Sequence, residues 1–199
     1  MRICILGWGS LIWDTRPEFD DHHGPWDLDG PTLKLEFSRV SESRLRALTL
    51  AIDPAHGAHC RIAYAESTRK NPDDAICDLR SREGTVLRYI GAVFLDGSRL
   101  QGGDEATREA IQTWAQEKQF DVVVWTDLPA DFQKKTGMPF SVDAACTHLQ
   151  GLSVEGKAKA AEYVWRAPDF IVTPLRQRLQ GESWFAPPPS IASRARSTS

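Results

Sequence analysis

A short loop near the N-terminus combines backbone freedom with a hydroxyl group. The apolar run Ile3 to Leu6 is followed directly by Gly7-Trp8-Gly9-Ser10-Leu11. The two glycines let the backbone turn with positive φ and approach a ligand closely, and the N–H groups that follow can hold an anion or a carbonyl oxygen. We therefore predict that this loop binds a small molecule.

Common loop motifs do not account for this segment. A Walker loop ends in Lys-Ser or Lys-Thr, and a dinucleotide fingerprint needs a third glycine, neither of which is present here. Ser10 is not the serine of a G-x-S-x-G nucleophile elbow. A structural alternative stays open, in which the glycines only permit a tight strand exit and Trp8 and Trp13 are core aromatics.

Glu83 is the candidate for acid-base chemistry. The chain from Asn71 to Gly84 begins and ends with helix-capping residues. At 3.6 residues per turn, Glu83 lies about 20° from the face marked by Ile76 and Leu79, so its carboxylate should point inward. Lost hydration and the negative end of the helix dipole both disfavour the ionised form. They should raise the pKa of Glu83 into a range useful for proton transfer.

Two neighbouring arginines permit another interpretation of Glu83. Arg80 and Arg82 lie on the same predicted helix, and either could hold the carboxylate ionised. Such an ion pair on a helix surface contributes only about 0.2–0.5 kcal/mol and has no chemical role. The residues of the helix alone leave both interpretations open.

Several segments resemble the γ-glutamylcyclotransferase-like family. Trp8-Gly9-Ser10-Leu11 after a short strand is similar to the family's aromatic-Gly-Ser-Leu signature, in which Tyr usually holds the first position. Leu79 to Gly84, before the apolar segment Tyr89 to Leu95, resembles the helix end that carries the catalytic glutamate. Phe37–Ser41 and Leu48–Ile52 resemble the second and third strands. The likeness ends at Leu95, beyond which the chain matches the well-known enzymes poorly.

The resemblance implies a fold and a set of site residues. The implied fold is α+β, with a mixed, strongly curved sheet or small barrel followed by a helical C-terminal extension. Gly9, Ser10 and Leu11 would contact the substrate's glutamyl group through their backbone, and Trp8 would belong to the same binding loop. Because Trp8 lacks the phenol hydroxyl of the usual Tyr, the pocket should differ there. Glu83 would be the catalytic acid/base.

The implied reaction is intramolecular. Glu83 would take a proton from the α-ammonium of a γ-glutamyl compound, and the freed amine would attack the compound's own γ-carbonyl. The products would be 5-oxoproline and an amine. Because nucleophile and electrophile belong to one molecule, we expect neither a metal nor a cofactor. The rival hypothesis is a non-catalytic module that binds a small metabolite or peptide in the same pocket, a choice that the fold does not decide.

Histidines and arginines offer further candidate ligands. His56, His59 and Cys60 could join His22 and His23 around a metal, but no cysteine pair supports such a site, and we predict none. A further set could bind a substrate carboxylate if it pointed into the pocket. This set comprises Arg39, Arg44, Arg46 and Arg61. Their places on predicted half-exposed strands favour solvated arginines instead.

Composition favours one globular domain with a small-molecule partner. The chain has 199 residues, 41% of them hydrophobic, and a net charge of −3 that gives no reason to expect nucleic acid or an acidic membrane. We expect a domain over residues 1–181 and a flexible tail over 182–199. Widely spaced cysteines suggest free thiols, and with no apolar stretch long enough to span a membrane we expect a cytoplasmic protein. The sequence predicts no oligomeric state.

The predicted elements alternate before the chain becomes mainly helical. We expect strands at residues 2–6, 32–39, 46–52, 60–65, 88–95 and 121–125. We expect helices at residues 72–83, 104–118, 142–149, 155–166 and 174–180. The helical extension thus begins at about residue 104, and a long loop covers residues 14–31, where turn residues dominate.

Overall fold

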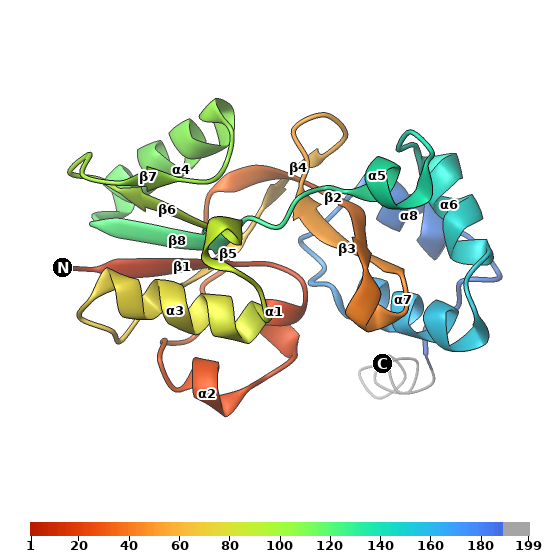
Figure 1. Cartoon of the computed structure of the whole chain (residues 1–199), viewed down its shortest axis with the longest axis horizontal. Coiled ribbons are helices and arrows are strands. Elements are labelled where there is room, and N and C mark those ends of the chain that lie inside the picture. The colour runs from red at the N-terminus through yellow and green to blue at the C-terminus, as the bar shows by residue number, and fades with distance from the viewer. Residues whose placement is uncertain (189–199) are drawn as a thin grey trace, which may run out of the picture.

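Two β-sheets lie side by side and are surrounded by helices in a computed structural model, which describes residues 1–188 (Figure 1). This architecture confirms the α+β class and a mixed sheet. The small-barrel alternative is wrong, because the strands form two open sheets. The chain passes from one sheet to the other at Ile62, which lies between two strands and donates its N–H to the carbonyl of Pro31.

The larger sheet places two strand ends at one edge. Its strands, in spatial order, are β5 (Ala63–Glu66), β1 (Ile3–Gly7), β8 (Val122–Thr126), β6 (Ile90–Phe94) and β7 (Leu100–Gln101). β1 and β8 are parallel, with Ile5 opposite Val124, and the other pairs are antiparallel. Because parallel strands end at the same edge, the loop after β1 and the segment after β8 emerge together.

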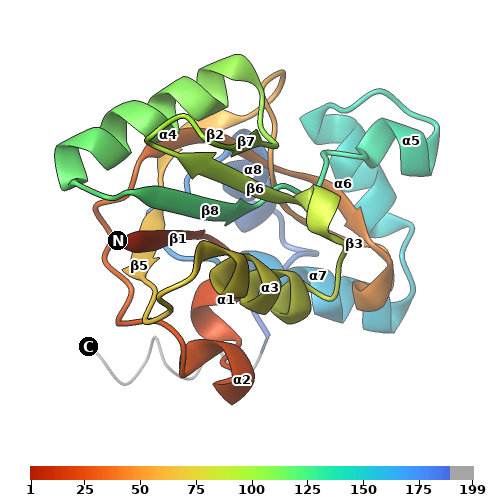
Figure 2. The same ribbon diagram turned by 60° about the vertical axis from the view of Figure 1, so that its left-hand side comes forward.

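Helices cover both faces of this sheet (Figure 2). Side chains of β1 alternate between the faces, as a fully buried strand requires. Ile3 and Ile5 belong to a core cluster with residues of α3 (Pro72–Glu83), whereas Cys4 and Leu6 belong to a second cluster with residues of α4 (Glu105–Lys118). The continuous apolar run at the N-terminus is thereby explained.

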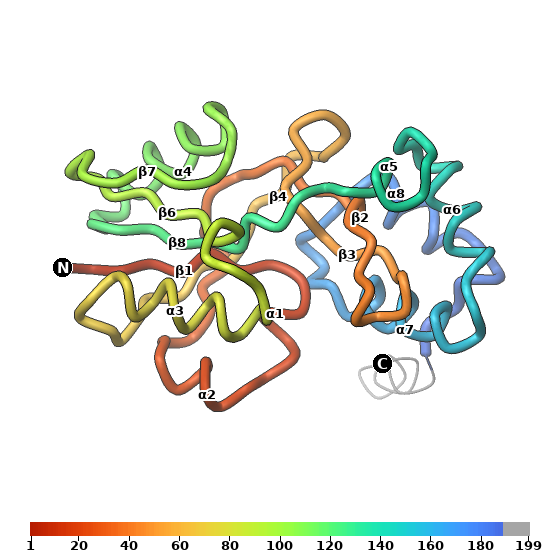
Figure 3. Tube along the Cα trace, in the orientation of Figure 1, coloured from red at the N-terminus to blue at the C-terminus, as the bar shows by residue number. Residues whose placement is uncertain are grey.

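The smaller sheet carries the helical extension. Its strands, in spatial order, are β3 (Ala47–Ile52), β2 (Thr32–Ser41) and β4 (Ala58–Arg61). The helices that follow β8 are α5 (Phe132–Thr136), α6 (Val142–Gln150), α7 (Val154–Arg166) and α8 (Pro174–Gln180). They gather around this sheet, as the Cα trace in Figure 3 shows. β2 shifts register between Glu36 and Arg39, an irregularity that is common beside functional sites.

A buried carboxyl group fastens α8 to β2. The carboxyl of Glu36 accepts hydrogen bonds from the Thr173 hydroxyl at 2.6 Å, the Phe37 N–H at 2.7 Å and the Leu175 N–H at 3.3 Å. Burial raises the pKa of Glu36, although these hydrogen bonds oppose the shift. Three donors compensate for the lost hydration of this group and fix the last helix against the sheet.

The short elements were not predicted. Within the expected loop, α2 (Pro17–Asp20) forms one turn, and α1 (Ser10–Trp13) begins at the binding loop itself. Two 3₁₀ turns, Glu42–Arg44 and Leu87–Tyr89, also interrupt the pattern. The expected strand over residues 60–65 is divided between β4 and β5.

The C-terminal part is described as far as residue 188. Phe185 is buried, and its carbonyl accepts a hydrogen bond from the indole N–H of Trp165 at 3.0 Å. The expected tail over 182–199 therefore starts with a docked segment, and residues 189–199 lie outside the described residues. All four cysteines are free thiols. Within residues 1–188, each helix is too short or too polar to cross a bilayer.

The packing of α3 can be tested with two leucines. Leu79 lies on the buried face of α3 and is fully buried, so Leu79→Ala should lower the free energy of unfolding by about 2–5 kcal/mol. Leu87 is 51% exposed, so Leu87→Ala should change it by less than about 0.5 kcal/mol. Urea unfolding followed by circular dichroism measures both. Equal effects would show that α3 is not packed as described.

Candidate functional site

The predicted loop and the predicted glutamate line one cavity of about 360 Å³. Leu6, Trp8, Ser10 and Leu11 contribute from β1 and the loop after it, and Glu83 contributes from α3. The remaining walls come from the ends of β2 and β3, the segment after β8, and α7. The cavity therefore lies where the two sheets meet.

Helix α3 delivers Glu83 to this cavity. The side chain of Asn71 caps the start of the helix by accepting from the Asp73 N–H at 3.1 Å, and Gly84 ends it with φ of 58°. These observations confirm the predicted boundaries. Ile76 and Leu79 pack on the sheet, so Glu83, on nearly the same face, is directed inward as the helical spacing predicts.

The carboxyl of Glu83 lies among positive charges but has no direct partner. Among residues 1–188 no side chain forms an ion pair with it within 4.0 Å, and no group donates a hydrogen bond to it. Burial raises its pKa above the ordinary glutamate value of 4.5. Four arginines oppose that shift: Arg82, Arg16, Arg39 and Arg44. The group is thus free to exchange a proton with a ligand.

Arg82 joins the helix to the loop instead of pairing with Glu83. Its guanidinium donates to the carbonyls of Ser10 at 3.1 Å and Asp14 at 2.7 Å. Arg80 donates to Ser81. Neither arginine makes the helix-surface ion pair that the sequence left open, since neither lies within 4.0 Å of the Glu83 carboxyl in the described part of the chain.

The loop residues play unequal parts in the cavity. Trp8, Ser10 and Leu11 line it, whereas Gly9 does not. Gly9 precedes α1 with φ of 59°, and a Cβ there would collide with the Tyr163 hydroxyl. Position 9 therefore needs glycine so that the side chain of Tyr163 can approach the backbone. From the sequence, we expected glycine to be needed there for the approach of a ligand.

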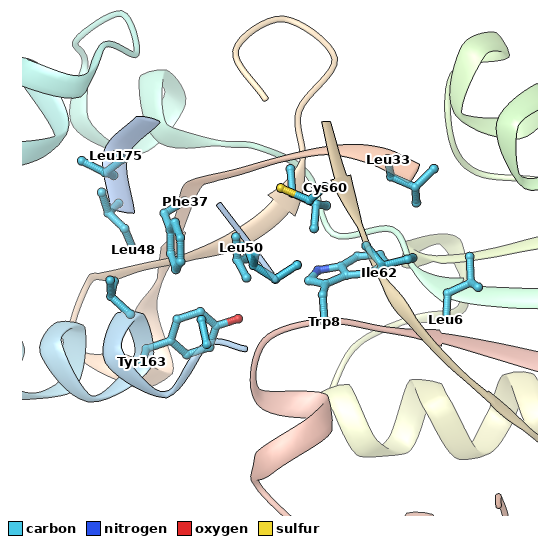
Figure 4. Close-up of a cluster of buried hydrophobic side chains, with 14 of the residues drawn as sticks. Leu6, Trp8, Leu33, Phe37, Leu48, Leu50, Cys60, Ile62, Tyr163 and Leu175 are labelled. Carbon is cyan, nitrogen blue, oxygen red and sulfur yellow. The ribbon is translucent and has the colours of Figure 1, made fainter. Parts of the chain in front are cut away.

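Tyr163 was not predicted as a site residue. It lies on α7, lines the cavity, and packs edge-on against Phe37. Its hydroxyl points toward the turn that carries Trp8 (Figure 4). Burial, and secondarily the Glu83 carboxylate, raises the pKa of Tyr163 to about 12, so the phenol remains a hydrogen-bond donor. In the sequence, Tyr163 lies at helical spacing among apolar residues, a pattern that predicts a core residue. Its hydroxyl is the one feature that could have indicated a site.

The candidate arginines divide into two pairs. Arg39 and Arg44 line the cavity, with 24% and 20% of their side chains exposed. Arg46 and Arg61 do not, with 43% and 62% exposed. The expectation of solvated arginines is therefore wrong for the first pair. Strand alternation could not reveal this, because the register shift and the turn after β2 redirect these residues.

The histidines make separate local contacts. His23 packs against Phe19 and Trp26, whereas His56 contacts Asp53 and Phe140. Within residues 1–188, no group of three or more His, Cys, Asp or Glu side chains is arranged to hold a metal ion.

No match was found when the chain was compared with protein-family models, curated proteins and solved structures. The assignment of a function therefore rests on the cavity and on the residues that line it.

The raised pKa of Glu83 should appear in the pH dependence of stability. The folded protein binds a proton on Glu83 more tightly than the unfolded chain does. Glu83 therefore stabilises the folded state at pH values below the ordinary pKa of glutamate. That contribution is lost as pH rises. From acidic to neutral pH, the free energy of unfolding of the wild type should therefore fall relative to that of Glu83→Gln, as measured by urea titration.

Glu66 provides a control with the opposite sign. Its hydrogen bond from Arg2 lowers its pKa, so its contribution is present at neutral pH and lost as pH falls. Relative to Glu66→Gln, the wild type should gain stability toward neutral pH. The same slope for both variants would contradict a raised pKa at Glu83.

Proposed function

We propose that this protein is a cofactor-independent γ-glutamylcyclotransferase-like enzyme. It cyclises a γ-glutamyl amide to 5-oxoproline and releases an amine, with Glu83 as the general acid/base. The observation that carries the proposal is the position of Glu83. Its half-buried carboxyl has a raised pKa, has no ion-pair partner among the described residues 1–188, and shares a cavity with Trp8, Ser10 and Leu11.

Glu83 moves the proton in this mechanism. Its carboxylate accepts a proton from the substrate's α-ammonium, and the resulting amine attacks the γ-carbonyl carbon of the same molecule. The new C–N bond forms at the γ-carbon, and the amide C–N bond breaks as the protonated Glu83 gives its proton to the leaving amine. The regenerated Glu83 carboxylate then accepts the second proton from the ring nitrogen and passes it to the amine, which leaves as an ammonium ion. A pKa raised by burial brings the carboxyl closer to the amines with which it exchanges this proton.

The arginines suit the substrate's carboxylate. A γ-glutamyl group carries one α-carboxylate. Arg39 faces the cavity from β2, and Arg44 faces it from the 3₁₀ turn that follows this strand. Arg44 is further oriented by the rings of Trp13 and Tyr163, which lie 5.5 and 5.0 Å from its guanidinium carbon. A guanidinium held on aromatic faces is well prepared to bind a carboxylate through two hydrogen bonds.

The phenol of Tyr163 suits the developing oxyanion. Its raised pKa keeps the proton on the oxygen, and the hydroxyl lies beside the backbone of Gly9 in the binding loop. Together with loop N–H groups it would stabilise the tetrahedral intermediate. This phenol would also return to the pocket a hydroxyl that Trp8 does not provide.

A non-catalytic binding module is the second candidate. The observation in its favour is the charge of the cavity, where four arginines face a single glutamate. Such a lining could retain an acidic metabolite without chemistry. The two candidates differ in whether a bound γ-glutamyl compound is converted.

The catalytic role of Glu83 predicts a specific loss. A panel of γ-glutamyl compounds is incubated with the protein, and 5-oxoproline is detected by mass spectrometry. For a substrate that is turned over, Glu83→Gln should lower kcat by at least about 10²-fold, the usual contribution of a general acid/base. Glu66→Gln, on an exposed ion pair far along the sheet, should retain wild-type turnover. Unchanged turnover of Glu83→Gln would refute the assigned role, and binding without product would favour the module.

The role of Tyr163 predicts a change in kcat with little change in KM. Tyr163→Phe keeps the ring and removes only the hydroxyl, so kcat should fall by about 10²-fold if the phenol stabilises the oxyanion. Tyr64→Phe is the matched control, because its hydroxyl bonds to Asp27 outside the cavity. An equal effect of both variants would contradict the role given to Tyr163.

A further inference from the structure

A second groove adjoins the Glu83 cavity. It has a volume of about 690 Å³ and is bordered by Tyr89, residues 129–131 and α5. Arg39 lines both spaces. The segment that joins β8 to α5 (Figure 1) also contributes to both spaces, because Leu128 lines the cavity and residues 129–131 line the groove. The two spaces are neighbours that meet at Arg39.

Cationic side chains border this groove. Lys134 and Lys135 of α5 join Arg39, and the carboxylate in the lining is that of Asp131. Asp131 is already engaged, because it lies 3.5 Å from the Arg39 guanidinium and accepts the Val40 N–H at 2.9 Å.

The two lysines differ in their availability. The ammonium of Lys135 lies 3.0 Å from the carboxylate of Glu42. Lys134 is exposed, and within the described range 1–188 no carboxylate lies within 4.0 Å of its ammonium group. The groove therefore presents a positive charge at Lys134 that a ligand could neutralise, with Arg39 at the junction.

We infer that this groove binds an acidic leaving group. The substrate would extend from the amide at Glu83 past Arg39, and would carry a carboxylate or phosphate that meets Lys134. The inference rests on the proposed function, because it takes the reacting amide to lie at Glu83. It deepens that function by excluding simple alkylamines as the preferred leaving group.

The construction of the groove supports a role in selecting the substrate. Its far wall is α5 with the segment that precedes it, and both follow Leu95, where the family resemblance ends. A small uncharged amine would leave this wall without a contact. An acidic group placed there would gain charge-assisted interactions that position the leaving group in the groove. A neutral leaving group would lack these interactions and bind more weakly.

Three synthetic probes test the inference. The acidic probe is γ-glutamyl-glycyl-glutamate, and the neutral probe is γ-glutamyl-glycyl-glutaminamide. A third probe with phosphoserinamide at the last position distinguishes phosphate from carboxylate. Calorimetric titration of the full-length Glu83→Gln protein measures affinity without consumption of the probes. We expect an acidic probe to bind about tenfold more tightly than the neutral one, a preference that weakens at high salt.

Charge-removing variants assign this preference to the groove. Lys134→Gln in the Glu83→Gln background should reduce the ratio of affinities toward one. Arg39→Gln should lower the affinity for every probe, because Arg39 also faces the cavity that receives the α-carboxylate common to all three. Arg61→Gln and Lys70→Gln should retain the ratio, because both side chains lie outside the two spaces. Lys134 is exposed, so its replacement should not disturb folding. Equal affinity for all three probes, or a preference that survives the removal of Lys134, would overturn the inference.

The assay separates this inference from the proposed function. If the wild type releases 5-oxoproline from all three probes, and the Glu83→Gln protein binds the three equally, the groove has no selective role and the proposed function stands. If the acidic preference depends on Lys134 but no probe yields 5-oxoproline, the groove is an acid-binding site and the proposed function fails.

Discussion

The buried guanidinium of Arg82 is the contact on which the site depends. It reaches from the end of α3 to the carbonyls of Ser10 and Asp14, and so joins the helix that carries Glu83 to the loop that faces it. Burial lowers the pKa of this group, yet an arginine keeps its charge in proteins, so the bridge holds at any ordinary pH. Together with the buried cluster that Leu11 shares with residues of α3, it holds the glutamate and the loop on one cavity.

Two electrostatic effects act on Glu83 in opposite directions. Burial raises its pKa, whereas the surrounding arginines lower it, and the net result is a raised pKa. An ion pair would have held the carboxylate ionised, but Arg82, whose charge lowers the pKa of Glu83 most, donates to backbone carbonyls instead. The cavity thus combines an available proton acceptor with a positive field, a combination suited to a substrate that contains both an ammonium and a carboxylate.

The sequence predicted the elements whose signals are local. Capping at Asn71, Ser141 and Thr173 and the apolar runs of β1 and β8 defined boundaries that the structure confirms within a few residues. The direction of Glu83 also followed from helical periodicity. The passage of the chain from one sheet to the other at Ile62 could not be predicted, because an apolar residue within an apolar run does not mark a change of sheet. Tyr163 and Arg44 reach the cavity only through tertiary packing, which periodicity does not encode.

The carboxyl of Glu83 can be observed directly. Carbon-13 NMR of selectively labelled glutamate, with Glu83→Gln to assign the resonance, gives its titration curve in the intact protein. We predict a midpoint above the ordinary value of 4.5, and a change in that midpoint when a γ-glutamyl compound binds. A midpoint at or below the ordinary value, unaffected by any such compound, would contradict a proton-transfer role for this residue.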